Sequence, residues 1–326
     1  MKRKLELQLL PRAERIKLLE EKGKQPKTIE QQIDILKSRK MIIVDDTFAK
    51  HLLADVNYYR LTGYTFPYKT NDVYNEDFSI ENAYGLYELD DHIRNLLFSL
   101  IGRFEIRLKT QFAYVMSLEH GSAAHLKEEL YSSNHFSFSR YIKEYEHILS
   151  QKYSSDLQFV RWNIDTYSEL PIWAAVEVLS FGTVSKLYSA IIDKEAKEAI
   201  AKSFHTHQAK SGRVFHLSTH TLISWSRSLC YIRNLCAHHE RLFRRSFKIS
   251  PTLFRDSKGI DNGSIFGALI VLGYLYRAMW SQDWQQALEI LKNLEDHIGI
   301  EFLRYYGFTD DWADRLGAPG TQERLF

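Results

Sequence analysis

Residues 226–245 read SRSLCYIRNLCAHHERLFRR, and the apolar side chains in this stretch recur at the spacing of a helix. On a helical wheel these apolar residues fill one arc, which predicts a helix that buries this arc against its neighbours. The opposite arc carries cationic and amide side chains: Arg227, Arg233, Asn234, His238, Arg241, Arg244 and Arg245. The rest of the chain has no comparable cluster, so this face is the candidate functional site.

Two adjacent histidines fall on different arcs of the wheel. His238 lies at the edge of the polar arc, one turn after Asn234, and is the predicted reactive histidine because imidazole changes its protonation near neutral pH. His239 falls within the apolar arc. This position predicts a histidine in the core or at an interface, where it would support the site.

Arginine, asparagine and histidine without a carboxylate pair or a catalytic thiol are suited to one kind of chemistry. When RNA is cut by its own 2′-hydroxyl, one proton is taken, another is given, and negative charge builds on the phosphate. Histidine can carry both protons near neutral pH, arginine can bind the phosphate oxygens, and asparagine can orient either group. This scheme needs no metal and no cofactor, and the histidines elsewhere in the chain lack the carboxylate or cysteine companions of a metal site.

The R-x4-H spacing from Arg233 to His238, with Asn234 after the arginine, is similar to the signature of the HEPN superfamily. The longer string RNLCAHHERL resembles the hallmark of the Abi-like abortive-infection family, of the AbiD and AbiF type. Three further stretches resemble that family in the same order: NYYRLTGY at 57–64, LYELDDHIR at 86–94, and ELPIW at 169–173 followed by EVLSFGTVS at 177–185.

The resemblance implies an all-α, HEPN-type helical bundle with an N-terminal helical extension, and a ribonuclease toxin used in anti-phage defence. It places Arg233, Asn234 and His238 at the catalytic positions. It also implies a homodimer in which two R-x4-H motifs face each other, and an RNA or protein antitoxin as a possible partner. Two positions depart from the family pattern: Arg244-Arg245 stands where an Asn-Arg pair is usual, and Lys109 stands where arginine is common.

Two carboxylates interrupt apolar segments and need partners. Glu105 lies between Arg103 and Arg107 in a long apolar run, so it either forms a structural ion pair or orients a site arginine from a neighbouring helix. Glu177 is the only charged residue of residues 172–181, and we expect Arg233 to be its partner.

Arg227, Arg241 and Arg245 are the predicted supporting contacts to RNA, because arginine predominates over lysine on this face. A second RNA contact is possible in residues 58–69, where rings alternate with cations. Such rings can stack on unpaired bases, but they can equally cap the helical core at a turn. We favour the core-capping interpretation, with Tyr59 and Arg60 as the exceptions.

Composition sets broad limits on the function. The 326 residues carry a net charge of only +2, so any contact with nucleic acid must be local. Cys230 and Cys236 point in different directions on one helix and cannot bridge each other within it, which suits a reducing cytoplasm. The N-terminus lacks the apolar core of a signal peptide, and the longest apolar run, 265–276, is too short to cross a bilayer, so we expect no membrane association.

Three segments are predicted: a charged helical extension at 1–40, the Abi-like domain at 41–316 and a flexible tail at 317–326. Periodicity and capping signals predict helices at 28–38, 45–57, 79–118, 123–131, 139–151, 171–181, within 183–208, from 218 or 219 onward, at 264–280 and at 282–298.

Two alternative functions share the same cationic helix. A non-catalytic RNA-binding module in a toxin–antitoxin or defence complex would need the arginines but not His238. A helical scaffold for protein partners would show no salt-dependent affinity for RNA.

Overall fold

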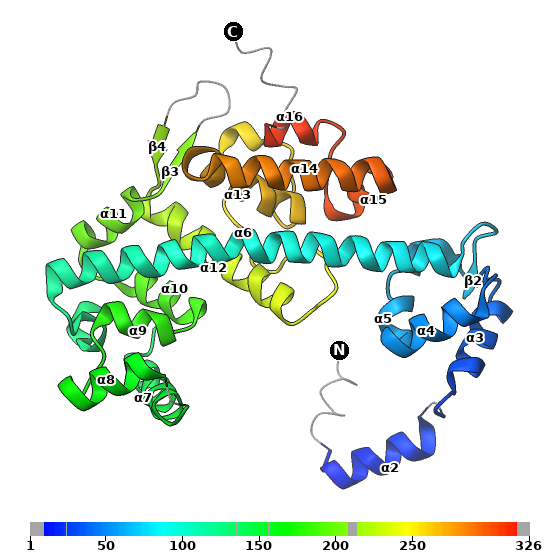
Figure 1. Ribbon diagram of the computed structural model, residues 1–326, viewed down its shortest axis with the longest axis horizontal. Helices are drawn as coiled ribbons and strands as arrows, with labels where there is room; N and C mark the ends of the chain where they lie inside the picture. The colour runs from blue at the N-terminus through cyan, green and yellow to red at the C-terminus, as the bar shows by residue number, and fades with distance from the viewer. Residues whose placement is uncertain (1–9, 24, 135, 156, 208–213, 318–326) are drawn as a thin grey trace. The chain divides into compact units, whose positions relative to one another are not determined.

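The computed structural model describes residues 10–23, 25–134, 136–155, 157–207 and 214–317. Helices make up most of this part of the chain, and the predicted all-α class is confirmed (Figure 1). The chain divides into two compact units, Met1–Tyr87 and Glu88–Phe326, and the long helix α6 (Ile80–His120) contributes residues to both. The three segments predicted from the sequence remain a prediction. Residues 1–9 of the extension and 318–326 of the tail lie outside the described residues.

The described residues of the first unit form four α-helices, a short hairpin and the start of α6. The elements are α2 (Arg12–Lys22), α3 (Ile29–Ser38), α4 (Asp46–Asp55), α5 (Tyr58–Thr62), β1 (Lys69–Thr70) and β2 (Val73–Tyr74). Thr28 and Gln31 form a capping box at the start of α3, as their spacing predicts. No residue of α2 is buried, so it packs little apolar surface.

The second unit holds the remaining helices and a second hairpin. They are α7 (Phe138–Ser154), α8 (Gln158–Tyr167), α9 (Ile172–Val178), α10 (Phe181–Ala190), α11 (Lys194–Lys202), β3 (His205–His207), β4 (Val214–His216), α12 (Thr219–Ala237), α13 (Ile265–Met279), α14 (Ser281–Ile298), α15 (Ile300–Leu303) and α16 (Trp312–Leu316). The strands of each hairpin are antiparallel, with Lys69 opposite Tyr74 and His205 opposite His216.

Helix α13 is buried from Ile265 to Tyr276 and forms the centre of the second unit. Its apolar residues continue all round the helix, which is the pattern of a helix enclosed by protein on every side. A Cβ on Gly273 would lie 2.8 Å from the Trp284 ring, so glycine allows α13 and α14 to approach closely. None of the described helices is both long and apolar enough to cross a membrane.

Three predicted elements differ from the structure. Residues 123–131 form two short 3-10 turns, Ala124–Leu126 and Glu128–Leu130, instead of one helix. The predicted helix 171–181 ends at Val178, and Gly182 lies inside α10 because the Ser180 side chain caps a new helix there. Within 183–208, residues 205–207 form a strand that pairs with β4.

Candidate functional site

Helix α12 carries the R-x4-H residues. It begins where predicted: the Ser218 hydroxyl accepts a hydrogen bond from the Thr221 backbone N–H and caps the first turn. The buried face of α12 includes Leu222, Trp225 and Leu229, which hold the helix against its neighbours. The solvent face is therefore fixed in direction, and Arg227, Asn234 and His238 are exposed on it.

Arg233 is the most constrained cation of this face. Its Nε and one Nη donate to the same Glu105 oxygen at 3.1 and 2.8 Å, and its other Nη donates to the Asn234 side-chain oxygen at 3.1 Å. The guanidinium also lies 5.7 Å from the centre of the Phe181 ring, within cation–π range. Glu105 comes from α6 and Phe181 from α10, so three helices meet at this one side chain.

Glu105 is shared by two cations. Its second oxygen accepts from Lys109 at 3.1 Å, one turn further along α6. The side chains of Glu105 and Arg233 retain 15% and 22% of their exposure, so the pair is shielded from bulk water but can be reached. One carboxylate between two cations leaves a net positive charge, which favours a phosphate as the approaching group. The partner of Glu105 is thus an arginine of the candidate site on a neighbouring helix, and both interpretations of Glu105 include such an ion pair.

The helix ends sooner than the periodicity suggested. Ala237 is its last residue, His238 is the cap, and His239 adopts a left-handed backbone conformation at φ 51°. Asp90 of α6 explains why the chain turns here. Its fully buried carboxylate accepts from the Leu242 backbone N–H at 3.1 and 3.2 Å and from the Tyr306 hydroxyl at 3.0 Å.

The Asp90 carboxylate also binds Arg94 at 2.8 Å, and Arg94 is 98% buried. The sequence shows this pair as an ordinary i, i+4 contact on a helix. The structure shows that it is the anchor of the segment that follows His238, a role for Asp90 that the sequence analysis missed. The available signal was a charged pair within the apolar run of α6.

The structure corrects two predictions about the site. His239 is exposed, because the wheel used to place it on the buried arc does not apply beyond Ala237. Glu177 is exposed and Arg233 pairs with Glu105 instead, so the predicted Glu177–Arg233 pair is wrong. Phe181 and Lys109, by contrast, contact the site residues without having been predicted to do so.

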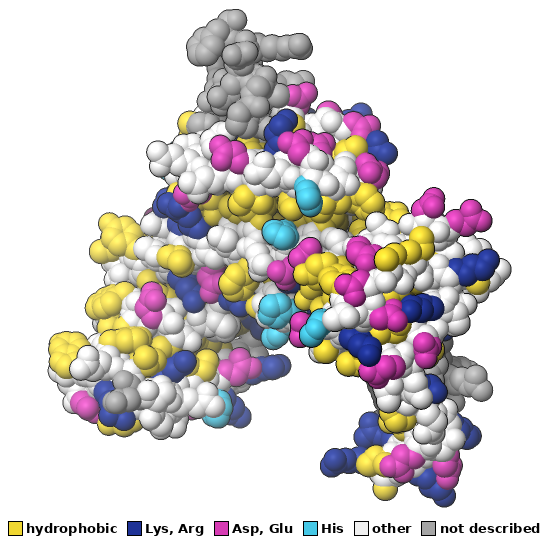
Figure 2. Space-filling view, turned by 45° about the vertical axis from the view of Figure 1, so that its right-hand side comes forward, with side chains coloured by type: hydrophobic (Ala, Val, Ile, Leu, Met, Phe, Trp, Pro, Cys, Tyr) yellow, Lys and Arg dark blue, Asp and Glu magenta, His cyan; other side chains and the backbone are white. Residues whose placement is uncertain are grey.

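The supporting arginines have different surroundings. Arg227 and Arg241 are exposed, whereas Arg245 binds Glu240 at 2.8 Å. Arg241 and Arg245 follow the end of α12, so they do not extend its cationic face as the wheel suggested. Positive and negative side chains are interspersed over the face drawn in Figure 2, and the net charge of the chain is small. Any attraction for RNA is therefore local.

Tyr59 and Arg60 belong to the first unit. Tyr59 is 72% exposed and Arg60 is exposed, whereas Tyr64 of the same segment is fully buried. Core packing thus accounts for part of this aromatic segment, and the two predicted exceptions do face solvent.

The two cysteines of α12 are free and buried. Burial raises the pKa of the Cys230 thiol and raises the pKa of Cys236 to about 12. Neither is a reactive thiolate at neutral pH. Within the described residues, no group of three or more histidine, cysteine, aspartate or glutamate side chains is arranged to hold a metal ion.

Fold and site together define a helical protein with an R-x4-H motif, whose arginine is held by a carboxylate from a second helix and whose histidine is exposed. A family model described as Abi-like protein matches residues 51–244, more than half of the chain. The chain belongs to this family, which points to a role in abortive infection. No curated protein and no solved structure matches the chain.

Proposed function

We propose that this protein is a metal-independent endoribonuclease of abortive infection, of the HEPN superfamily and the AbiD or AbiF type. The observation that carries the proposal is the preset guanidinium of Arg233, held by Glu105 and Asn234 five residues before an exposed histidine. A guanidinium fixed in this way is oriented to bind a phosphate, and this supports the proposal.

Arg233 would stabilise the charge that builds on the phosphate. A guanidinium has five N–H groups, and three of them take part in the bonds to Glu105 and Asn234. Within the described residues two N–H groups remain for phosphate oxygens. Because Glu105 fixes the plane of the guanidinium, little reorganisation is needed when the charge develops.

His238 would transfer the protons. A neutral imidazole takes the proton of the 2′-hydroxyl while its oxygen bonds to phosphorus. The bond from phosphorus to the 5′-oxygen then breaks, and an imidazolium gives that oxygen a proton. The products are a 2′,3′-cyclic phosphate and a 5′-hydroxyl. Asn234 would hold the Arg233 guanidinium in place through the bond it already accepts.

A second copy of the chain would complete the site. Base and acid act on opposite sides of the phosphorus, and each chain supplies one His238. A two-fold axis beside the exposed end of α12 would bring two such histidines together. We therefore propose a homodimer acting on RNA in the cytoplasm, restrained before infection by an RNA or protein antitoxin.

One observation favours the alternative of a non-catalytic RNA-binding module. Among the described residues, no hydrogen bond orients the His238 side chain, whereas a histidine base is usually aligned by a third group. In the dimer that group would come from the second copy. In a binding module it would be unnecessary.

Incubation of the purified protein with labelled single-stranded RNA in EDTA tests the proposal. Cleavage should leave 2′,3′-cyclic phosphate ends, and His238→Ala should abolish it. The matched control is His51→Ala, which removes an exposed histidine of α4 outside the site and should cut normally. RNA that is bound but never cut by the wild type would support the binding module and end the enzyme proposal.

A further inference from the structure

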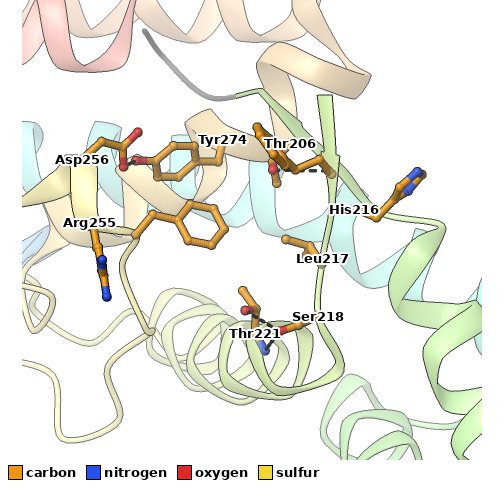
Figure 3. Close-up of a pocket in the computed structure, with 10 residues that line it drawn as sticks. Thr206, His216, Leu217, Ser218, Thr221, Arg255, Asp256 and Tyr274 are labelled. Carbon is orange, nitrogen blue, oxygen red and sulfur yellow. Dashed lines mark hydrogen bonds between the residues drawn. The ribbon is translucent and has the colours of Figure 1, made fainter. Parts of the chain in front are cut away.

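The proposed chemistry uses the C-terminal end of α12, but the N-terminal end of the same helix borders a cavity. The cavity measures 390 Å³ and lies between α12, the β3–β4 hairpin, residues 254–256 and Tyr274 of α13 (Figure 3). This volume is at the lower end of the range for small-molecule sites. A cavity of this volume can hold one nucleoside, that is, a planar base with its sugar.

The walls of the cavity are aromatic. Phe215, Phe254 and Tyr274 line it, and the Phe254 and Tyr274 ring centres lie 4.8 Å apart. Both rings also pack against the fully buried Trp225 of α12, with centres 5.4 and 6.4 Å away. These rings are held by the core, whereas Phe215 is 45% exposed on the hairpin. Tyr274 and Phe254 thus form a fixed aromatic wall, and the exposed Phe215 ring is the one that can stack on a nucleobase of any sequence.

Polar groups border the aromatic walls. The Ser218 and Thr221 hydroxyls bond to each other at 2.9 Å and keep lone pairs for a further donor. Asp256 accepts a hydrogen bond from the Tyr274 hydroxyl, which Figure 3 shows extending toward it, while the His216 ring turns away. A carboxylate here can also accept from the exocyclic amino group of a base, which adenine, cytosine and guanine have and uracil lacks.

A row of exposed side chains runs along α12 from His220, which precedes the cavity-lining Thr221 in the sequence, to the R-x4-H motif. His220, Arg227, Asn234 and His238 are exposed at steps of seven, seven and four residues, so they lie along one side of α12. Eighteen residues of helix extend over about 27 Å. A few nucleotides of extended single strand cover that distance, and Arg227 lies between the two ends to contact a phosphate.

We propose that this cavity binds one unstacked base of the RNA strand, a few nucleotides from the phosphate held at Arg233. It prefers a base with an exocyclic amino group. The inference rests on the proposed function for the position of the cut, but the binding of the base can be tested without any cleavage.

The test measures the affinity for a fluorescent single-stranded RNA of about ten nucleotides, within the site sizes of such proteins. Its sugars carry 2′-fluoro groups and lack the attacking hydroxyl, so the RNA cannot be cut. Phe215→Ala should weaken binding about tenfold, because one stacking contact is lost. Val214→Ala, at the neighbouring 56% exposed position of β4, is the matched control and should leave the affinity unchanged.

Two further measurements distinguish the loss of a base contact from a general loss of RNA affinity. The dependence of affinity on salt should stay the same in Phe215→Ala and become shallower in Arg227→Ala, because only the second change removes a phosphate contact. Wild type should bind oligo(A) more tightly than oligo(U), and Asp256→Ala should reduce that preference.

Equal affinities for Phe215→Ala and Val214→Ala would overturn the inference, as would equal binding of oligo(A) and oligo(U) by the wild type. These outcomes are distinct from a failure of the proposed function. If RNA is bound with these properties but unmodified RNA is never cut, the base site stands and the nuclease does not.

Discussion

Arg233 in the last turns of α12 and His238 at its C-cap lie five residues apart, yet their surroundings are opposite in kind. Arg233 is held by a carboxylate from α6, by its neighbour Asn234 and by the Phe181 ring. His238 caps the helix in solvent, and among the described residues its side chain takes part in no hydrogen bond. Contacts within the fold thus fix Arg233, the proposed charge-stabilising group, whereas no hydrogen bond of the described residues fixes the side chain of His238, the proposed proton-transferring group.

This difference suits a site in which one chain alone fixes the phosphate-binding arginine, whereas the histidine depends on a dimer of the chain. A group that binds a phosphate benefits from being fixed before the substrate arrives. A histidine that needs a counterpart across a two-fold axis can be completed only by a second copy. The two environments therefore respond differently to substitution.

The largest effect is expected at His238. His238→Ala should lower the rate of RNA cleavage by about 10² to 10⁴, the usual contribution of a general acid or base. Because the side chain is exposed, free imidazole should reach the vacated position and restore part of the rate. The rate is followed with labelled RNA over a series of imidazole concentrations. A variant as active as the wild type would remove histidine from the mechanism.

Arg233→Lys should lower the rate by about 10² to 10³, as expected when a preset donor to the developing charge is lost. An ammonium can pair with Glu105, but it lacks the planar fork that contacts Glu105, Asn234 and phosphate together. Imidazole should not rescue this variant. Arg227→Lys is the matched control on the same helix and should change the rate by less than about threefold. Equal rates for both variants would show that the fixed geometry of Arg233 has no role.

Asp90→Asn should lower the free energy of unfolding by about 3 kcal/mol, because it leaves Arg94 buried beside a neutral side chain. Asp91→Asn is the control. Asp91 also binds Arg94, at 2.5 Å, but its side chain is 39% exposed, and we expect a loss below about 1 kcal/mol. Urea denaturation measures both. A similar small loss in the two variants would mean that Asp90 does not anchor the segment after α12.

The pH dependence of stability should come from a different histidine. Burial lowers the pKa of His125 to about 4, and its side chain is fully buried. Below an unfolded pKa of about 6.5, the unfolded chain binds a proton that the folded chain does not, so stability falls as the pH falls toward 4.

Between pH 6.5 and pH 5 this uptake of a proton should lower the free energy of unfolding by about 1.5 kcal/mol. Urea denaturation at the two pH values should show the loss in the wild type and in His238→Ala, and a smaller loss in His125→Phe. An unchanged loss in His125→Phe would assign the acid sensitivity to other groups.

Local signals in the sequence were sufficient for much of the fold. The Thr28–Gln31 capping box fixed the start of α3, Ser218 fixed the start of α12, and the apolar run at 265–276 predicted α13. The motif also predicted that Arg233 and Asn234 lie on one helix, with His238 now found at its C-cap, and the long apolar run drew attention to Glu105.

Tertiary contacts account for the errors. No glycine or proline marks the end of α12 in the sequence. The helical wheel was therefore extended beyond Ala237, and it wrongly placed His239 in the core. The turn depends on Asp90, which binds the Leu242 N–H from a position 152 residues earlier in the chain. Similarly, Glu177 and Glu105 both looked like carboxylates in need of a cation, and only the packing of α6 beside α12 decides between them.

Mixing inactive and active chains tests the central claim most directly. Wild-type protein is unfolded and refolded together with an excess of His238→Ala, and RNA cleavage is measured per wild-type chain in EDTA. If two copies build each site, the activity per wild-type chain should fall in proportion to the fraction of wild-type chains. Activity that stays constant at every ratio would show that one chain suffices, and would contradict the account of an open histidine completed by a second copy.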